Sequence, residues 1–186
     1  MKRIVLIICL TVSTLSLQAQ KLKKGNLKYL KEETKICVIF DYSSVTFDGM
    51  EEEYFIEKNA KDSAWINKWY TSVKPNLHRH FILEMNKELV GKLLLRAGDD
   101  PDAKYQATIK MLKMNNWADR YTWFSSSEPD FDAEITITKT NSTEVLAIIF
   151  LNAEGNHFAG TIESRGESTY EKGGEQLGEF FVKKIR

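Results

Sequence analysis

Hydrophobic and polar residues alternate along two segments of this chain, and two other segments are continuously apolar. Residues 105–114 and 131–138 alternate with a period of two, which is typical of strands with one buried face. Residues 145–151 form a solid apolar run, so together with 131–138 they predict an antiparallel hairpin with an inner second strand. The five apolar residues of 36–40 predict a strand buried on both faces.

A helical period follows in the middle of the chain. Asp62 and Ser63 offer a helix N-cap, and apolar residues then recur at three- and four-residue steps. Pro75 interrupts this pattern, because a proline either ends a helix or occupies the first turn of the next one. The segment 63–90 is therefore predicted to form two consecutive helices or one kinked helix. Its apolar stripes consist of Trp65, Ile66, Trp69, Tyr70, Val73, Leu77, Phe81, Met85 and Leu89.

A second helical pattern closes the chain. Ser168 and Glu171 fit a capping box, and an apolar stripe runs from Tyr170 onwards. Leu177 and Phe181 on this stripe are predicted to be core residues. Three glycines each cost the helix up to about 1 kcal/mol relative to alanine, which is tolerable if they let the helix lie close to the sheet. These glycines are Gly173, Gly174 and Gly178.

Two connections have the residues of turns. Asp48-Gly49 separates the apolar stretches 45–47 and 54–56, which predict either a hairpin or an irregular excursion. The stretch from Gly98 to Asp102 predicts a loop. The order of elements is then a buried strand, a long helical region, a strand, a hairpin and a closing helix. This order predicts an α+β fold with a mixed sheet of about four strands and helices packed mainly on one face.

Three segments resemble those of a known group of proteins. Residues 35–42, 132–151 and 170–181 are similar to the corresponding segments of small exported bacterial envelope proteins with the anticodon-binding-domain-like α/β sandwich. This group includes the TolB N-terminal domain, CsgG and LpoB. The resemblance covers residues 35–186, which we therefore predict to be a single domain. It implies a scaffold and interaction role and no catalysis.

The start of the chain predicts export. Lys2 and Arg3 precede an apolar run at 4–10, and small residues follow up to Ala19, which is the layout of a secretory signal peptide. Cleavage after Ala19 would leave residues 20–34 as a lysine-rich, mobile lead-in. The apolar run is too short to cross a bilayer. We therefore expect an exported protein, periplasmic or secreted, without a transmembrane segment.

Cysteine content and charge exclude further classes. Cys9 lies inside the apolar run and lacks the small residues that precede a lipid-attachment cysteine, so no lipid anchor is expected. Cys37 then remains alone and is predicted to be a buried thiol. Loss of Lys2 and Arg3 leaves 24 of the 26 basic side chains against 26 acidic ones, a net charge of −2. A nearly neutral chain has no global basic field, so nucleic-acid binding is not expected.

No combination of residues predicts an active site, a cofactor or a metal site. His78 and His80 point in different directions on a helix, and His157 has no second ligand nearby in sequence. The aspartates at 99–102 match no calcium loop, and the run Glu51–Glu53 is typical of a solvated surface. The serines at 125–127 and the glycines lack the motifs of hydrolases and nucleotide sites.

One segment is unusually aromatic. Four aromatic residues lie within eight positions of a polar connection: Trp117, Tyr121, Trp123 and Phe124. Exposed aromatic side chains form sugar-stacking or protein-binding surfaces, because they offer large apolar areas at a low entropy cost. The alternative is that these rings fold back and cover the sheet.

The sequence therefore predicts an exported, non-enzymatic envelope protein that acts as a protein-interaction or assembly module, with another envelope protein as its partner. A second hypothesis is a periplasmic or secreted protein that binds a glycan or peptide through the aromatic segment.

Overall fold

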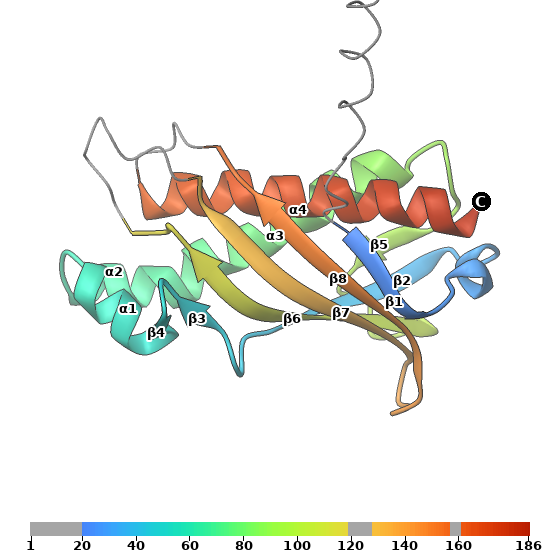
Figure 1. The fold of residues 1–186 in the computed structure, drawn as a ribbon, viewed down its shortest axis with the longest axis horizontal. Coiled ribbons are helices and arrows are strands. Elements are labelled where there is room, and N and C mark those ends of the chain that lie inside the picture. The colour runs from blue at the N-terminus through green and yellow to red at the C-terminus, as the bar shows by residue number, and fades with distance from the viewer. Residues whose placement is uncertain (1–19, 119–127, 157–160) are drawn as a thin grey trace, which may run out of the picture.

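The computed structural model describes residues 20–118, 128–156 and 161–186. Their fold is one mixed sheet with helices α3 and α4 lying side by side along one of its faces (Figure 1). A smaller unit of α1, α2, β3 and β4 lies at one end of the sheet (Figure 1). The α+β class that the sequence predicts is confirmed. Among the described residues, no helix is both long and apolar enough to cross a membrane.

The sheet has eight strands, and six of them follow the order β1-β8-β7-β6-β2-β5. β1, β8, β7 and β6 pair with their neighbours in antiparallel fashion, whereas β6-β2 and β2-β5 are parallel. The short β3 pairs with β6 and with β4. The strands are β1 (Gln20–Gly25), β2 (Lys35–Asp41), β3 (Thr46–Phe47), β4 (Met50–Glu51), β5 (Arg96–Gly98), β6 (Tyr105–Asn115), β7 (Asp130–Lys139) and β8 (Val145–Glu154).

The prediction of about four strands is therefore wrong in number. The four strands with clear apolar patterns, β2, β6, β7 and β8, all form. The prediction that β2 is buried on both faces is wrong at its end, where Ile39 is 42% exposed and Phe40 is half-buried, because the helices cover only one face of the sheet (Figure 1). The additional strands are short or rich in lysine, so they carry too few apolar positions for a period of two to show. β5, for example, contributes only Arg96–Gly98 and ends at the first residue of the segment expected to be a loop.

Residues 20–34 differ most from expectation. In place of a mobile lead-in, they form edge strand β1 and the 3₁₀ turn η1 (Lys28–Leu30). Leu27 and Leu30 are buried in the core. The lysines of β1 are exposed, whereas Leu22 between them is only half-buried against the core. A single apolar residue among lysines is enough for an edge strand, because only one of its faces needs to be apolar.

The helices are α1 (Glu52–Asn59), α2 (Ser63–Lys68), α3 (Lys74–Leu89) and α4 (Ile162–Ile185), and a π-helical turn η2 (Trp69–Val73) joins α2 to α3. The side chain of Asp62 caps α2 by accepting a hydrogen bond of 2.8 Å from the backbone N–H of Trp65. Pro75 lies in the first turn of α3, directly after the π-helical turn η2. The predicted N-cap and interruption are thus both confirmed.

Two other predictions needed correction. Asp48 and Gly49 have positive φ angles and form the predicted turn, but the returning strand is Met50–Glu51, and residues 54–56 belong to α1. The closing helix begins at Ile162 and not near Ser168, because Thr161 and Ser164 form its capping box. Ser168 instead accepts a hydrogen bond from the backbone N–H of Asn156.

The core lies between the sheet and the α3-α4 layer. Leu177 and Phe181 of α4 are both 0% exposed, as predicted. Cys37 is also buried, and burial raises the pKa of its thiol, so it is a poor nucleophile at neutral pH.

Candidate functional site

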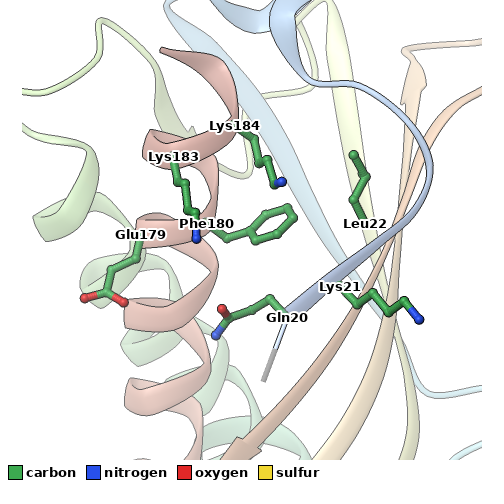
Figure 2. A pocket seen from close by; sticks show the side chains of 7 residues that line it. All are labelled: Gln20, Lys21, Leu22, Glu179, Phe180, Lys183 and Lys184. Atoms are coloured by element: carbon green, nitrogen blue, oxygen red, sulfur yellow. The ribbon is translucent and has the colours of Figure 1, made fainter. Parts of the chain in front are cut away.

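A cleft of about 280 Å³ separates edge strand β1 from the last turns of α4 (Figure 2). Its lining combines two short sequence segments that lie about 160 residues apart. They are Gln20, Lys21 and Leu22 from β1, and Glu179, Phe180, Lys183 and Lys184 from α4. The two segments meet because β1 pairs with β8, and α4 packs on that end of the sheet.

Figure 2 shows how the side chains divide the cleft. Gln20 and the ring of Phe180 lie in the space between strand and helix. Lys184 extends from α4 into this space, whereas the side chain of Lys183 runs along the helix. Glu179 points away from β1, and the side chain of Lys21 leaves the strand on the side away from α4. The part of the cleft between the two elements therefore has Phe180, which is 6% exposed, with the ammonium group of Lys184 lying 5.6 Å from its ring centroid.

These lysines have no acidic partner among the described residues, because no ion pair within 4 Å involves Lys21, Lys183 or Lys184. Two structural roles account for part of this arrangement. Lysines near the C-terminus of a helix interact favourably with its dipole, and lysines on an edge strand discourage aggregation. Neither role explains why the charges from α4 lie beside an open cleft with an aromatic wall.

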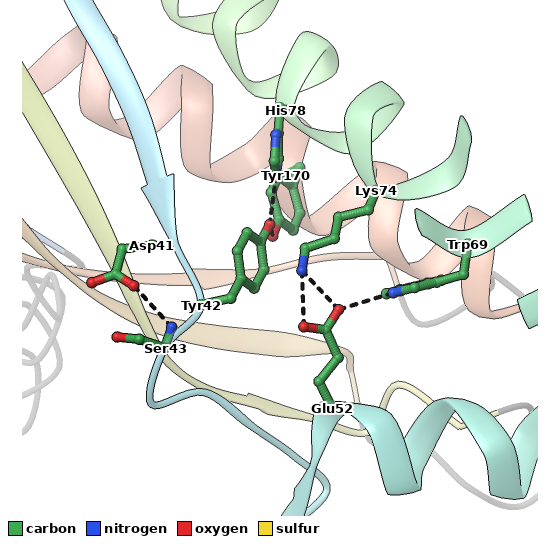
Figure 3. A network of polar contacts seen from close by, with 8 residues as sticks. All are labelled: Asp41, Tyr42, Ser43, Glu52, Trp69, Lys74, His78 and Tyr170. Carbon is green, nitrogen blue, oxygen red and sulfur yellow. Dashed lines mark hydrogen bonds and ion pairs between the residues drawn. The ribbon is translucent and has the colours of Figure 1, made fainter. Parts of the chain in front are cut away.

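A second group of polar residues lies at the other end of the helical layer (Figure 3). The hydroxyl of Tyr42, just after β2, forms hydrogen bonds with the hydroxyl of Tyr170 on α4 and with Nε2 of His78 on α3, the latter at 2.8 Å. The ring of His78 also stacks on Phe40, with 4.1 Å between the ring centroids. This group ties β2, α3 and α4 together.

An ion pair continues the network into the small unit. Lys74 of α3 contacts both carboxylate oxygens of Glu52 at 2.8 Å, and each of these side chains is only 16% exposed. Nε1 of Trp69 donates to the same carboxylate at 2.9 Å, and the ammonium group of Lys74 lies 3.7 Å from the centroid of the Tyr42 ring. Glu52 thus fixes α1 against η2 and α3 (Figure 3).

The electrostatics of the network favour a structural role. Burial raises the pKa of the Tyr42 and Tyr170 hydroxyls well above their usual value, so both stay protonated and act only as hydrogen-bonding groups. Burial, and then the charge of Lys74, lower the pKa of His78 to about 4. Every polar group named here has its partner within the network, and none of them lines the cleft between β1 and α4.

His78 should make stability depend on pH. Its folded-state pKa of about 4 lies below the unfolded value of about 6.5, so the unfolded chain binds the proton first. Stability is therefore complete above about pH 6.5 and is lost as the pH falls towards 4. Because part of the ring is accessible, we expect a loss of about 2 kcal/mol from this residue.

Urea denaturation of the protein and of His78→Phe at a series of pH values measures this loss. The unfolding free energy of the protein minus that of His78→Phe should fall by that amount between pH 7 and pH 4. Parallel pH profiles for the two proteins would show that His78 does not titrate in this way.

The predicted aromatic site is not supported at its one described residue. Trp117 is 0% exposed and packs edge-on against Phe47 and Tyr170, with ring centroids 5.8 Å and 6.0 Å away. Its Nε1 donates to the backbone oxygen of Asp130 at 3.2 Å. Trp117 is thus a core residue, in line with the alternative that these rings fold back. Tyr121, Trp123 and Phe124 lie outside the described residues.

The other candidates separate as their spacing suggests. His78 contacts Tyr42, whereas Nδ1 of His80 lies 2.9 Å from a carboxylate oxygen of Glu171, so the two histidines serve different partners. Within the described ranges, no three histidine, cysteine or acidic side chains converge on a common metal position. Asp100 pairs with Lys35 at 2.5 Å and accepts from the backbone N–H of Asp102. His157 lies outside the described residues.

Sequence reasoning missed the cleft because neither of its halves carries a motif. A lysine-rich stretch at 20–24 and a Lys-Lys pair near the end of a helix are common. Only the pairing of β1 with β8 brings them together.

Comparison with known proteins identifies no family. No protein-family description and no curated protein matches this chain. Among solved structures, the PelC dodecamer from Paraburkholderia phytofirmans is 12% identical with a TM-score of 0.41, and covers 84% of this chain and 96% of that chain. A single-residue variant of the same PelC is 12% identical with a TM-score of 0.42, and covers 85% and 96%. Likeness at this level supports no argument about function.

Proposed function

We propose that this protein is an exported, non-enzymatic module of the cell envelope that binds another protein. The observation that carries this proposal is the cleft between β1 and α4, where an edge strand, Phe180 and two lysines without an acidic partner among the described residues meet. Partners of this kind of surface are proteins, because a free strand edge offers backbone hydrogen bonds that another polypeptide can match.

The export part of the proposal rests on the sequence of residues 1–19, whose basic start and apolar run are those of a signal peptide. Cleavage after Ala19 would make Gln20, which belongs to β1, the first residue of the mature protein. The new terminus would then lie at the cleft.

The non-enzymatic part rests on the polar network around Tyr42. This network gathers a histidine, a lysine, a glutamate and two tyrosines, which are residues that catalytic sites use. In this protein they are bonded to one another across α1, α3, α4 and the end of β2. A catalytic group needs a substrate within hydrogen-bonding reach. The hydrogen bonds of these groups are instead made with one another, and they hold the elements of the fold together.

Photocrosslinking in cell-envelope fractions tests the proposal. A photoreactive residue at position 183 should give one reproducible protein adduct, identified by mass spectrometry. The same residue at position 61, an exposed site between α1 and α2, should not give it. The protein recovered from these fractions should begin at Gln20, or within two residues of it, and carry no acyl chains. Retention of residues 1–19, or identical adducts from both positions, would contradict the proposal.

A further inference from the structure

The cleft between β1 and α4 restricts what can bind there. β1 ends the sheet order and pairs with β8 along one edge, so among the described strands none pairs with its other edge. Residues 20–22 pair in regular register with β8, and a β-bulge follows between Leu22 and Lys24. The regular part of β1 is the part that lines the cleft. The bulge interrupts the regular pairing with β8, so the regular part of the described edge is Gln20–Leu22.

Charges lie on both sides of this accessible edge. On the side of α4, Lys184 extends towards β1 with its ammonium group 5.6 Å from the centroid of the Phe180 ring, and Lys183 lies on the same turn of the helix (Figure 2). On the opposite face, the side chain of Lys21 leaves the strand, and Lys21 pairs with Phe150 of β8. An added strand would therefore meet ammonium groups with both sets of its alternating side chains.

From this geometry we infer that the cleft binds an acidic, extended peptide segment of a partner protein as an added strand beside β1. This inference rests on the proposed function, and it names the chemistry of the partner. Carboxylates on one face of the peptide would lie across from Lys21, as opposite charges do in cross-strand pairs. Side chains on the other face would lie beside the ammonium group of Lys184 and the exposed edge of the Phe180 ring.

A polyanionic glycan would satisfy the lysines equally well, but it offers no regular backbone partner for a strand edge. The same lysines would then act as point charges, and the binding would depend on charge alone. The free edge of β1 is thus the feature that favours a polypeptide.

Binding of a blocked eight-residue peptide of alternating Glu and Val to the mature protein, residues 20–186, tests the inference by isothermal titration calorimetry. Residues of one strand direct their N–H groups to alternate edges, so N-methylation at every second residue removes the donors of one edge only. Two N-methylated forms of the peptide are compared, one methylated along each edge. The form whose methyl groups face β1 should lose binding, and the other form should keep it. A peptide of alternating Lys and Val should not bind.

The matched protein variants separate the cleft from general charge. Lys183→Glu with Lys184→Glu should weaken binding by about tenfold or more. Lys58→Glu with Lys61→Glu, the same charge change on exposed residues around α1, should leave binding unchanged. Lys183→Gln with Lys184→Gln, which avoids repulsion at the end of α4, should also weaken binding while the circular dichroism spectrum stays the same.

Absence of peptide binding would overturn the inference, and so would equal binding of both N-methylated peptides. Full displacement of the peptide by polygalacturonate, with both methylated forms still binding, would also overturn it. A specific crosslink from position 183 combined with any of these would leave the proposed function in place and remove only the acidic strand. Failure of the crosslink would count against the proposed function itself.

Discussion

Replacing Trp117 by alanine is expected to lower the free energy of unfolding by about 3 to 5 kcal/mol, the range for large aromatic side chains lost from a core. The indole is 0% exposed and contacts the rings of Phe47 and Tyr170. Truncation would leave a cavity between the small unit and α4, and it would also leave the backbone oxygen of Asp130 without this donor. Urea denaturation followed by circular dichroism measures the effect.

The matched control is Tyr54→Ala. Tyr54 is an aromatic residue of α1 that is 61% exposed, so its loss should change stability by no more than about 0.5 kcal/mol. If Trp117→Ala cost less than about 1 kcal/mol, Trp117 would belong to the surface and be accessible to a partner.

Trp117 also shows why the sequence could not settle the aromatic segment. The sequence around a tryptophan that is flanked by Asn, Asp and Arg is the same whether its side chain faces solvent or the core. Its partners Phe47 and Tyr170 lie 70 and 53 positions away in the chain, and no local pattern links them to it. The residue that receives its hydrogen bond, Asp130, follows the connection itself.

The sequence predicts the long elements and fails at the short ones. β6, β7 and β8 are ten or eleven residues long, so the alternation of β6 and β7 and the apolar run of β8 are clear, and their bounds follow within three residues. β1 and β5 fail because edge strands need few apolar side chains. The start of α4 was misplaced because its capping box uses Ser164, where the usual pattern has Glu or Gln.

The candidate cleft could not be predicted, because it depends on long-range pairing. The lysines that form it have clear local explanations, so the sequence gives no reason to place Lys183 beside β1. By contrast, the close contact of α4 with its neighbours was anticipated from the glycines of 173–178, although the neighbour is chiefly α3 and not only the sheet.

Gly174→Ala is expected to destabilise the protein by about 3 kcal/mol or more, which is the upper range for overpacking a core. A Cβ atom at this position would lie 2.1 Å from the backbone oxygen of Phe81 and 3.0 Å from its Cα. These are backbone atoms of α3, so no side-chain rotation relieves the overlap, and α3 and α4 would have to move apart. On an exposed helix, the same change would stabilise by about 1 kcal/mol, so the two situations predict opposite signs.

Gly98→Ala is the control, since an added Cβ there meets nothing within 4 Å and the backbone is not in the left-handed region. It should be neutral within about 0.5 kcal/mol. Gly178→Ala should be destabilising as well, because its Cβ would lie 2.7 Å from the backbone oxygen of Met85 on the same helix α3. Thermal and urea denaturation of the three variants measure the differences. An unchanged or raised stability of Gly174→Ala would show that α3 and α4 do not touch along this line, and the helical layer that positions the end of α4 beside β1 would have to be arranged differently.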